Sequence, residues 1–389
     1  MPETGIRGYR GDWRRRGARW FAGCVRVLVT GAFGFVGTAL VARLTSAGHE
    51  IRALTSRAVA DQAAADRALT SRADTPVSEA EVVYGDVRDF ETMRRVVRGV
   101  DGVCHLAALV RVREAHERAR DYWAVNHGGA ATVARAALEE AARTGHAMRF
   151  VLASTGAVYG RPELQPIPED LPFQNTNDYG ETKRAAEREV LDVPGDGLFG
   201  AVVLRLFNVA GAVRGQIGDP ETVIPKTLAV ARGDLPALQI NGDGTAVRDF
   251  VHVYDAARAF ELALRHADPG RRAVFNVGAT GARVLDVVRT VQDVTGRQVP
   301  VEHRPSRGEA ARLLADTSRI RAELGWLPQH SDLRTMIADA WAAMGTAAEA
   351  KTEASATDTD TAQAAEPGPS GSPSPASAPA GPPPAAARV

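Results

Sequence analysis

A tyrosine and a lysine lie four residues apart in NDYGETKRAA, residues 177–186. The chain has 47 lysines and arginines, of which only Lys183, Lys226 and Lys351 are lysines. Tyr179 and Lys183 share one face if the stretch is helical. A free tyrosine titrates near pH ~10, too high for a base at neutral pH, and an adjacent cation lowers that pKa. The spacing therefore predicts a tyrosine base assisted by lysine, whose compact ammonium can also serve ribose hydroxyls in a way that arginine's rigid fork cannot.

Three glycines form a second candidate site in VLVTGAFGFVGTAL, where a predicted strand at 25–31 is followed by a predicted helix at 36–48. Gly31 permits a tight turn, Gly34 lets a pyrophosphate approach the backbone, and Gly37 allows the helix to pack closely on the strand. The N-terminus of that helix offers free N–H groups and a positive dipole end to phosphates. This strand–turn–helix context predicts a dinucleotide site.

Both candidate sites require a framework in which strands and helices alternate. Apolar, β-branched runs predict the strands, and amphipathic runs predict helices between them. Such alternation implies crossover connections and a doubly wound parallel sheet of Rossmann type with helices on both faces. The expected strands cover 25–31, 50–56, 81–87, 102–108 and 201–208, and residues 149–160 are expected to be a strand that runs into a turn. The expected helices cover 36–48, 90–100, 126–144, 179–191 and 332–343.

The pattern divides the chain into four segments. Residues 1–24 are an arginine-rich arm that we expect to be disordered, and residues 25–205 are expected to form a dinucleotide-binding domain of Rossmann type. From 206 to 345 the elements are shorter and more mixed, which predicts a smaller α/β lobe, partly interleaved with the first domain. Residues 346–389 are rich in Pro, Ala and Ser and are expected to be disordered, because they cannot bury enough apolar surface to offset their ordering entropy.

Composition argues against several function classes. Lys+Arg and Asp+Glu balance at 47 each, so net charge gives no support for nucleic-acid or general membrane binding. No apolar run reaches the roughly 18 residues of a membrane span, and the basic N-terminal stretch lacks the apolar core of a signal peptide. Cys24 and Cys104 lie beside strand-like runs without metal-ligand spacing, so both are expected to be buried, reduced packing residues, and no metal site is expected. We therefore expect a cytoplasmic protein.

TGAFGFVG with a downstream YxxxK resembles the extended short-chain dehydrogenase/reductases, in particular their nucleotide-sugar epimerase/dehydratase group. The resemblance covers residues 25–345 and extends to GDVRD (85–89) and HLAA (105–108). It implies a nicotinamide cofactor, a UDP- or other nucleotide-sugar substrate and a homodimer. The cofactor-binding residues that it implies are Gly31, Gly34, Phe35, Val36, Gly37, Thr55, Ser56, Arg57, Asp86, Val87, Leu106, Ala107, Ala108, Asn126, Tyr179, Lys183 and Phe207.

The resemblance also supplies a third catalytic residue and the substrate contacts. VLASTGAVYG offers two hydroxyls near a strand end, and its similarity to the family's SS-[ST]-x-x-VYG segment implies that Thr155 hydrogen-bonds the substrate oxygen while Ser154 is structural. LRLFNVAGA resembles LRYFNxxGA, which implies that Asn208 binds the sugar diphosphate. Two later stretches, NGDGTAVRDFVHVYDAARA and RPSRGEAARLLAD, resemble UDP-sugar 4-epimerases and imply further contacts from Arg248, Arg307 and Glu309.

The two positions after Thr155 separate reactions within the family. Sugar-nucleotide 4,6-dehydratases resemble this chain but carry Asp-Glu there, and decarboxylating relatives carry Ser-Glu, whereas this chain has Gly156 and Ala157. Neither 4,6-dehydration nor decarboxylation then has the acidic side chain that it requires at these positions. The resemblance therefore implies an NAD-dependent nucleotide-sugar 4-epimerase. In such an enzyme Tyr179 would take the proton from the sugar 4-hydroxyl, and bound NAD⁺ would supply reversible hydride acceptance at C4, so that a 4-keto sugar could turn and be reduced on its other face.

The end of the second predicted strand leaves an alternative open. NAD-specific relatives carry Asp there to bind the ribose 2′-hydroxyl, whereas this chain has Thr55, Ser56 and Arg57, and the arginine suits the 2′-phosphate of NADP. An NADPH-dependent nucleotide-4-keto-sugar reductase is therefore the alternative. A non-catalytic nucleotide-binding scaffold is a third hypothesis, and the intact catalytic residues argue against it. Leu313 lies near a position where a bulky tyrosine in relatives excludes N-acetyl groups, so the sequence favours room for a 2-acetamido sugar.

Overall fold

The computed structural model describes residues 24–56, 80–174, 177–194, 197–306 and 308–345. The chain divides into two compact units, Met1–Gly345 and Thr346–Val389, and all of these residues belong to the first. The predicted arginine-rich arm, apart from Cys24, and the predicted C-terminal tail therefore lie outside the described residues, as do Arg57 and Arg307.

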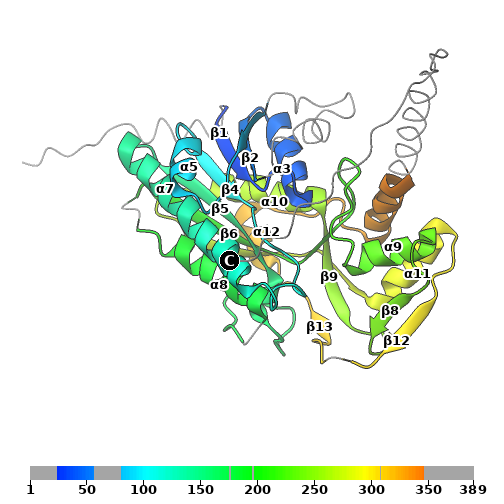
Figure 1. The fold of residues 1–389 in the computed structure, drawn as a ribbon. Coiled ribbons are helices and arrows are strands. Elements are labelled where there is room, and N and C mark those ends of the chain that lie inside the picture. The colour runs from blue at the N-terminus through cyan, green and yellow to red at the C-terminus, as the bar shows by residue number, and fades with distance from the viewer. Residues whose placement is uncertain (1–23, 57–79, 175–176, 195–196, 307, 346–389) are drawn as a thin grey trace, which may run out of the picture. The chain divides into compact units, whose positions relative to one another are not determined.

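Seven parallel strands form the central sheet, as predicted (Figure 1). Their order is β10-β6-β5-β4-β1-β2-β3, so the direction in which the chain adds strands reverses between β1 and β4. In doubly wound sheets a ligand binds outside the carboxyl ends of the strands at this reversal. The strands are β1 (Arg26–Thr30), β2 (Glu50–Thr55), β3 (Glu81–Tyr84), β4 (Gly102–His105), β5 (Met148–Thr155), β6 (Phe199–Leu206) and β10 (Arg272–Val277).

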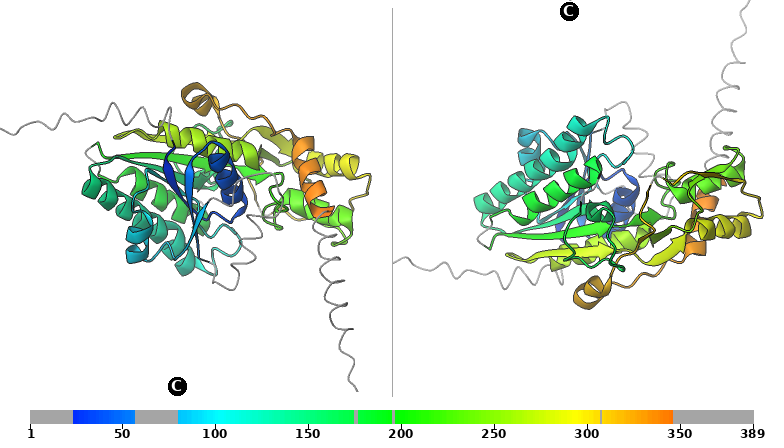
Figure 2. Two further views of the ribbon diagram at one scale, coloured as in Figure 1. Left: turned by 90° about the horizontal axis from the view of Figure 1, so that it is seen from above. Right: turned by 90° about the horizontal axis from the view of Figure 1, so that it is seen from below.

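Helices cover both faces of this sheet (Figure 2). Strand residues alternate between the faces: Val27 and Val29 pack into one core, whereas Leu28 packs into the other. Because both faces are buried, the strands are apolar almost throughout. The first face is covered by α3 (Phe35–Ser46), α10 (Val253–His266) and α12 (Ser318–Leu324), and the second by α5 (Phe90–Val96), α7 (Gly129–Thr144) and α8 (Asp178–Leu191).

Two local expectations need correction, and a third is confirmed. The helix predicted at 126–144 begins earlier, with α6 (Ala119–Tyr122) and a π-helical turn, η3 (Trp123–Gly128), before α7. The strand predicted to run into a turn over 149–160 does so: β5 ends at Thr155, and a 3₁₀ turn, η4 (Gly156–Tyr159), follows it. Cys104 is buried as expected, but Cys24 is exposed, because the sheet begins only at Arg26.

A second lobe has its own apolar core, which includes Leu228, Ile240 and Ile337. Its helices are α9 (Val223–Arg232), α11 (Val284–Thr295) and a last helix at 333–345, close to the 332–343 that the sequence predicts. After residue 206 the chain also returns to the main sheet for α10, β10 and α12, so the two lobes interleave along the chain. The strands of the lobe are β7 (Asn208–Ala210), β8 (Leu238–Asn241), β9 (Val247–His252), β11 (Thr280–Arg283), β12 (Val301–Arg304) and β13 (Arg312–Leu313).

Neither a membrane span nor a metal cluster is present in the part of the chain that the structure describes. No helix there is long and apolar enough to cross a bilayer. No group of three or more His, Cys, Asp or Glu side chains there could hold a metal ion.

The contact between α3 and the turn before it predicts the effect of a methyl group at Gly37. A Cβ at this position would lie 2.1 Å from the Gly31 carbonyl oxygen, so the backbone would have to shift. We expect Gly37→Ala to lower the free energy of unfolding by about 2 kcal/mol or more, measured by urea denaturation. Gly128→Ala is the control, because its Cβ would meet only the Trp123 carbonyl oxygen at 3.7 Å. Equal stability of Gly37→Ala and the wild type would contradict the close packing.

Candidate active site

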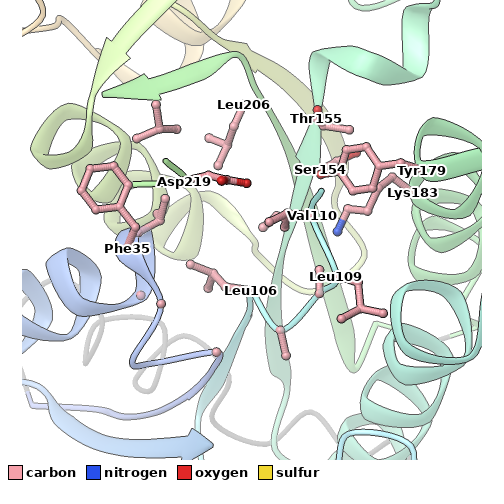
Figure 3. Close-up of a pocket in the computed structure, with 18 of the residues that line it drawn as sticks. Phe35, Leu106, Leu109, Val110, Ser154, Thr155, Tyr179, Lys183, Leu206 and Asp219 are labelled. Carbon is pink, nitrogen blue, oxygen red and sulfur yellow. The ribbon is translucent and has the colours of Figure 1, made fainter. Parts of the chain in front are cut away.

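The central feature is a cavity of about 790 Å³ at the carboxyl ends of β1 and β4, where the strand order reverses. Its size suits a small-molecule ligand. Figure 3 shows Tyr179 and Lys183 on one side of the cavity and Phe35 on the opposite side, with Asp219 between them. Apart from Tyr179, Lys183 and Phe35, the predicted site residues that line it are Gly31, Gly34, Val36, Gly37, Thr55, Ser56, Asp86, Val87, Leu106, Ala107, Ala108, Thr155, Phe207, Asn208 and Arg248.

The glycine turn closes the cavity between β1 and α3. Gly31 has a φ of +67°, and a Cβ there would lie 2.8 Å from the amide nitrogen of Ala107. Gly34 differs, since its Cβ would meet only the Gly31 carbonyl oxygen, at 3.3 Å. It precedes α3 and provides no side-chain cap, so the first amides of the helix remain available at the cavity wall. The turn thus has the open backbone and free N–H groups that a pyrophosphate requires.

Thr30 and His105 join this turn to the loop after β4. The Thr30 hydroxyl oxygen accepts hydrogen bonds from the amides of Leu106 and Ala107, both at 3.1 Å, and it is also hydrogen-bonded to His105 Nδ1 at 2.9 Å. Burial, aided by the charge of Lys183, lowers the pKa of His105 to about 3, so the imidazole stays neutral. The sequence analysis did not name either residue as part of the site, although Thr30 begins the quoted TGAFGFVG motif and His105 begins the quoted HLAA motif.

Tyr179 and Lys183 lie one turn apart on α8, and both side chains are buried at the cavity wall. The Asn177 side chain caps this helix by accepting a hydrogen bond from the Gly180 amide at 2.9 Å. Burial raises the pKa of Tyr179 to about 12, and a hydrogen bond with Thr155 opposes that rise. Burial lowers the pKa of Lys183 to about 8, so the ammonium remains largely charged at neutral pH. The site therefore holds a phenol, a hydroxyl and a cation together.

The ring of Tyr179 is oriented by the loop after β4. Tyr122 meets it edge-on, with ring centroids 6.4 Å apart, and donates a hydrogen bond to the Arg111 carbonyl at 2.7 Å. Asn126 ties the same loop to α8: its amide oxygen accepts from the Leu109 N–H, and its amide nitrogen donates to the Leu109 carbonyl and the Thr182 hydroxyl. Asn126 is thus buried behind the cavity wall, where it supports the loop and does not line the cavity.

Asp86, which was predicted to contact the adenine, already has a charged partner. Arg88 Nε lies 2.9 and 3.0 Å from the two carboxylate oxygens, and this hydrogen bonding holds the pKa of Asp86 below its usual range. Arg88 also lines the cavity, and the sequence reading overlooked it although it belongs to the quoted GDVRD stretch. An adenine amino group at Asp86 would therefore share its acceptor with Arg88.

The other end of the cavity is closed by Phe207 and the second lobe. A Cβ at Gly156 would lie 3.0 Å from the Phe207 ring, so a larger residue there would have to displace the aromatic side chain. Asn208 donates a hydrogen bond to the Asp249 carbonyl at 2.7 Å, and Arg248 donates to the Ala310 carbonyl at 2.9 Å. Both still line the cavity.

The remaining residues that were predicted to contact the substrate differ in their position relative to the cavity. Leu313, in β13, lines the cavity. Glu309 is exposed and outside the cavity lining, where it accepts a hydrogen bond from the Asn241 amide at 2.6 Å. Its predicted partner, Arg307, lies outside the described residues.

A segment at 216–222, which we call the cover segment, crosses the cavity and was missed from the sequence. Gln216 donates to the Thr38 hydroxyl at 3.2 Å, beside the glycine turn. A Cβ at Gly218 would lie 3.3 Å from the Phe35 ring. On the far side, Asp219 lies 3.6 Å from Arg111. The segment thus contacts both walls, and its only sequence signal is a Gly-Asp-Pro turn.

Comparisons with known proteins give one consistent result. The model of the NAD dependent epimerase/dehydratase family matches residues 27–278. UDP-glucose 4-epimerase of Corynebacterium glutamicum is 36% identical over 341 residues, which cover 84% of this chain and 98% of that protein. UDP-glucose 4-epimerase of Streptomyces lividans is 38% identical over 329 residues, which cover 81% and 95%.

A solved structure extends the agreement to the fold. The UDP-glucose 4-epimerase from Stenotrophomonas maltophila, with bound NAD and formylated UDP-arabinopyranose, matches with a TM-score of 0.74 at 30% identity. The match covers 84% of this chain and 99% of that one. The relatives are thus matched over nearly their whole length.

The glycine turn predicts that Gly34 matters for nucleotide binding, whereas Gly37 matters for stability. We expect Gly34→Ala to weaken nicotinamide-nucleotide binding at least about tenfold, because a methyl group would occupy the path of the pyrophosphate. Its free energy of unfolding without nucleotide should fall by less than about 1 kcal/mol, unlike that of Gly37→Ala. Isothermal calorimetry and denaturation of nucleotide-free protein measure the two effects. Undiminished nucleotide binding by Gly34→Ala would show that the pyrophosphate does not bind at this turn.

Proposed function

Because the chain belongs to the NAD dependent epimerase/dehydratase family, we propose that it is an NAD-dependent nucleotide-sugar 4-epimerase that interconverts UDP-glucose and UDP-galactose. The observation that carries the proposal is the meeting of Thr155, Tyr179 and Lys183 at one wall of a dinucleotide-sized cavity. The UDP-sugars are those of the similar epimerases.

The residues present fit NAD. The uncapped N-terminus of α3 and the open backbone at Gly34 suit the pyrophosphate, and Lys183 has no hydrogen-bond or ion-pair partner within the described part of the chain, so its ammonium is available to ribose hydroxyls. Thr55, Ser56 and Asp86 line the adenosine end, and Phe207 lines the end next to Thr155. NAD, when bound, accepts and returns the hydrogen at sugar C4 with its electron pair.

The protein's own groups move the proton. Tyr179 accepts it from the sugar 4-hydroxyl, and Thr155, at the end of β5, hydrogen-bonds the same oxygen. Burial opposes the phenolate, so a neighbouring cation is required to stabilise it, and Lys183 is the one on the same helix face. Tyr179 then returns the proton after the sugar has presented its other face. Asn208 and Arg248 hold the diphosphate, so that the sugar can turn while the nucleotide stays bound.

The alternatives have less support. The similar proteins are epimerases, and a related structure holds NAD, so an NADPH-dependent ketoreductase is not favoured. A non-catalytic scaffold would not need a tyrosine and a lysine buried together at the cavity wall. A cytoplasmic location and a homodimer, expected from composition and resemblance, are part of this proposal, and sedimentation would test the dimer.

The first test combines bound nucleotide with turnover. We expect the purified protein to carry about one NAD per chain, identified by mass spectrometry after denaturation, and to convert UDP-glucose to UDP-galactose without net change of the nucleotide. Tyr179→Phe should lower turnover about 10²- to 10⁴-fold, with NAD still bound and stability unchanged, because only the proton carrier is lost.

Two results would contradict this proposal. Undiminished turnover by Tyr179→Phe would remove this residue as the base. Recovery of NADP, or of empty protein that reduces a 4-keto sugar with NADPH, would favour the reductase.

The side chain of Leu313 at the cavity predicts a wider sugar specificity. We expect the wild type to accept UDP-N-acetylglucosamine, and Leu313→Tyr to lose that activity at least about tenfold while keeping most of its activity on UDP-glucose, because the larger ring fills the space beside C2. Leu313→Met is the volume-matched control. Failure of the wild type to turn over any UDP-N-acetylhexosamine would contradict this specificity.

A further inference from the structure

A buried polar cluster lies one helical turn beyond Lys183. It consists of Glu187 from α8, Ser154 from β5, Arg205 from β6 and Tyr159 from η4, and none of the four is more than 4% exposed. Burying two charges is expensive and gains little over apolar packing, so the cluster calls for a reason beyond packing.

Both oxygens of the Glu187 carboxylate accept hydrogen bonds within this cluster. Arg205 Nε lies 3.0 Å from Oε1, and Nη2 lies 2.7 Å from Oε2, in the two-pronged geometry that arginine prefers. The Ser154 hydroxyl also donates to Oε1. Arg205 is itself fixed from the other side, because Nη1 donates to the Tyr159 hydroxyl at 2.7 Å and the guanidinium stacks 4.8 Å from that ring.

Lys183 and Glu187 are four residues apart on α8, a spacing at which opposite charges ordinarily pair. No ion pair forms between them, because Glu187 is engaged by Arg205 and Ser154. We propose that Arg205 and Ser154 hold the Glu187 carboxylate away from Lys183, so that the ammonium stays unpaired for Tyr179 and the cofactor ribose. Glu187 and Arg205 are thus positioning residues, and their stated benefit to the base rests on the proposed function.

The charge balance explains why a pair is needed in place of a lone carboxylate. Glu187 and Arg205 form a neutral pair, so Lys183 has no carboxylate to itself, although the charge of Glu187 raises the pKa of Lys183 against the larger effect of burial. The other groups that face Lys183 carry no charge: Tyr179 on the same helix, the neutral His105 from β4 and the Thr155 hydroxyl from β5. Removing either member of the pair should therefore move the protonation of Lys183, and in opposite directions.

The three lysines of this chain make the test direct. Lysine labelled with ¹³C at Cε gives three signals in the full-length protein with its bound nucleotide, and Lys183→Arg identifies the one from Lys183. Lys226, paired with Glu221 at 2.7 Å on the surface, is the internal reference. Titration from pH 6 to 11 then reports Lys183 without any need for turnover.

Glu187→Gln should lower the pH at which Lys183 titrates by about one unit or more, since the negative charge is lost and Arg205 remains. Arg205→Met should raise it by a similar amount, because the freed carboxylate can pair with Lys183. The neutral double variant should return to within about half a unit of the wild type. In the same variants, the alkaline limb of the epimerase rate should move in parallel.

Tyr159→Phe is the matched control, because it removes a hydrogen bond from the same cluster and changes no charge. An unmoved Lys183 signal in Glu187→Gln, together with a fall in unfolding temperature like that of Tyr159→Phe, would show that the pair is structural only and overturn the proposal. If Arg205→Met does not fold, the Lys183 signals of Glu187→Gln and of the double variant still test the proposal. Shifted Lys183 signals in a protein without epimerase activity would reject the proposed function and leave this inference standing.

Discussion

The geometry of the site depends on one buried contact between β1 and β4. Thr30 is the last residue of β1 and His105 is the last residue of β4. Thr30 Oγ1 lies 2.9 Å from His105 Nδ1, at the point where the strand order reverses. The same threonine oxygen accepts hydrogen bonds from two amides of the loop after β4. These bonds hold the loop against the backbone of Gly31. A doubly wound sheet opens a crevice at this point, and the contact sets how far apart its two sides can lie.

The loop after β4 also connects this contact to α8, the helix that carries Tyr179 and Lys183. The loop after β4 is held by Asn126 to Thr182 of α8, while Tyr122 anchors its Arg111 carbonyl and packs edge-on against Tyr179. The cavity wall formed by the loop after β4 and the helix that carries Tyr179 and Lys183 are therefore connected through side chains that do not line the cavity. A change at the loop would reach the phenol through packing and hydrogen bonds.

Burial has two opposed consequences at α8. It fixes the orientations of Tyr179 and Lys183, yet it raises the pKa of the first and lowers that of the second, so it favours the neutral form of both. Local charge must then decide how much of the ammonium survives. The Glu187–Arg205 pair lies one helical turn beyond Lys183, and its proposed role is to hold the carboxylate without pairing it with the lysine.

The sequence by itself determined the features that depend on neighbouring residues. Strand and helix periodicity predicted the parallel sheet, steric demands at Gly31 and Gly37 predicted the turn, and helical spacing placed Tyr179 and Lys183 on one face. Only the tertiary structure decided that Asn126 supports the wall from behind, that Cys24 is exposed, and that the cover segment crosses the cavity. Most of these outcomes depend on distances between segments far apart in the chain, which packing sets and which local periodicity does not encode.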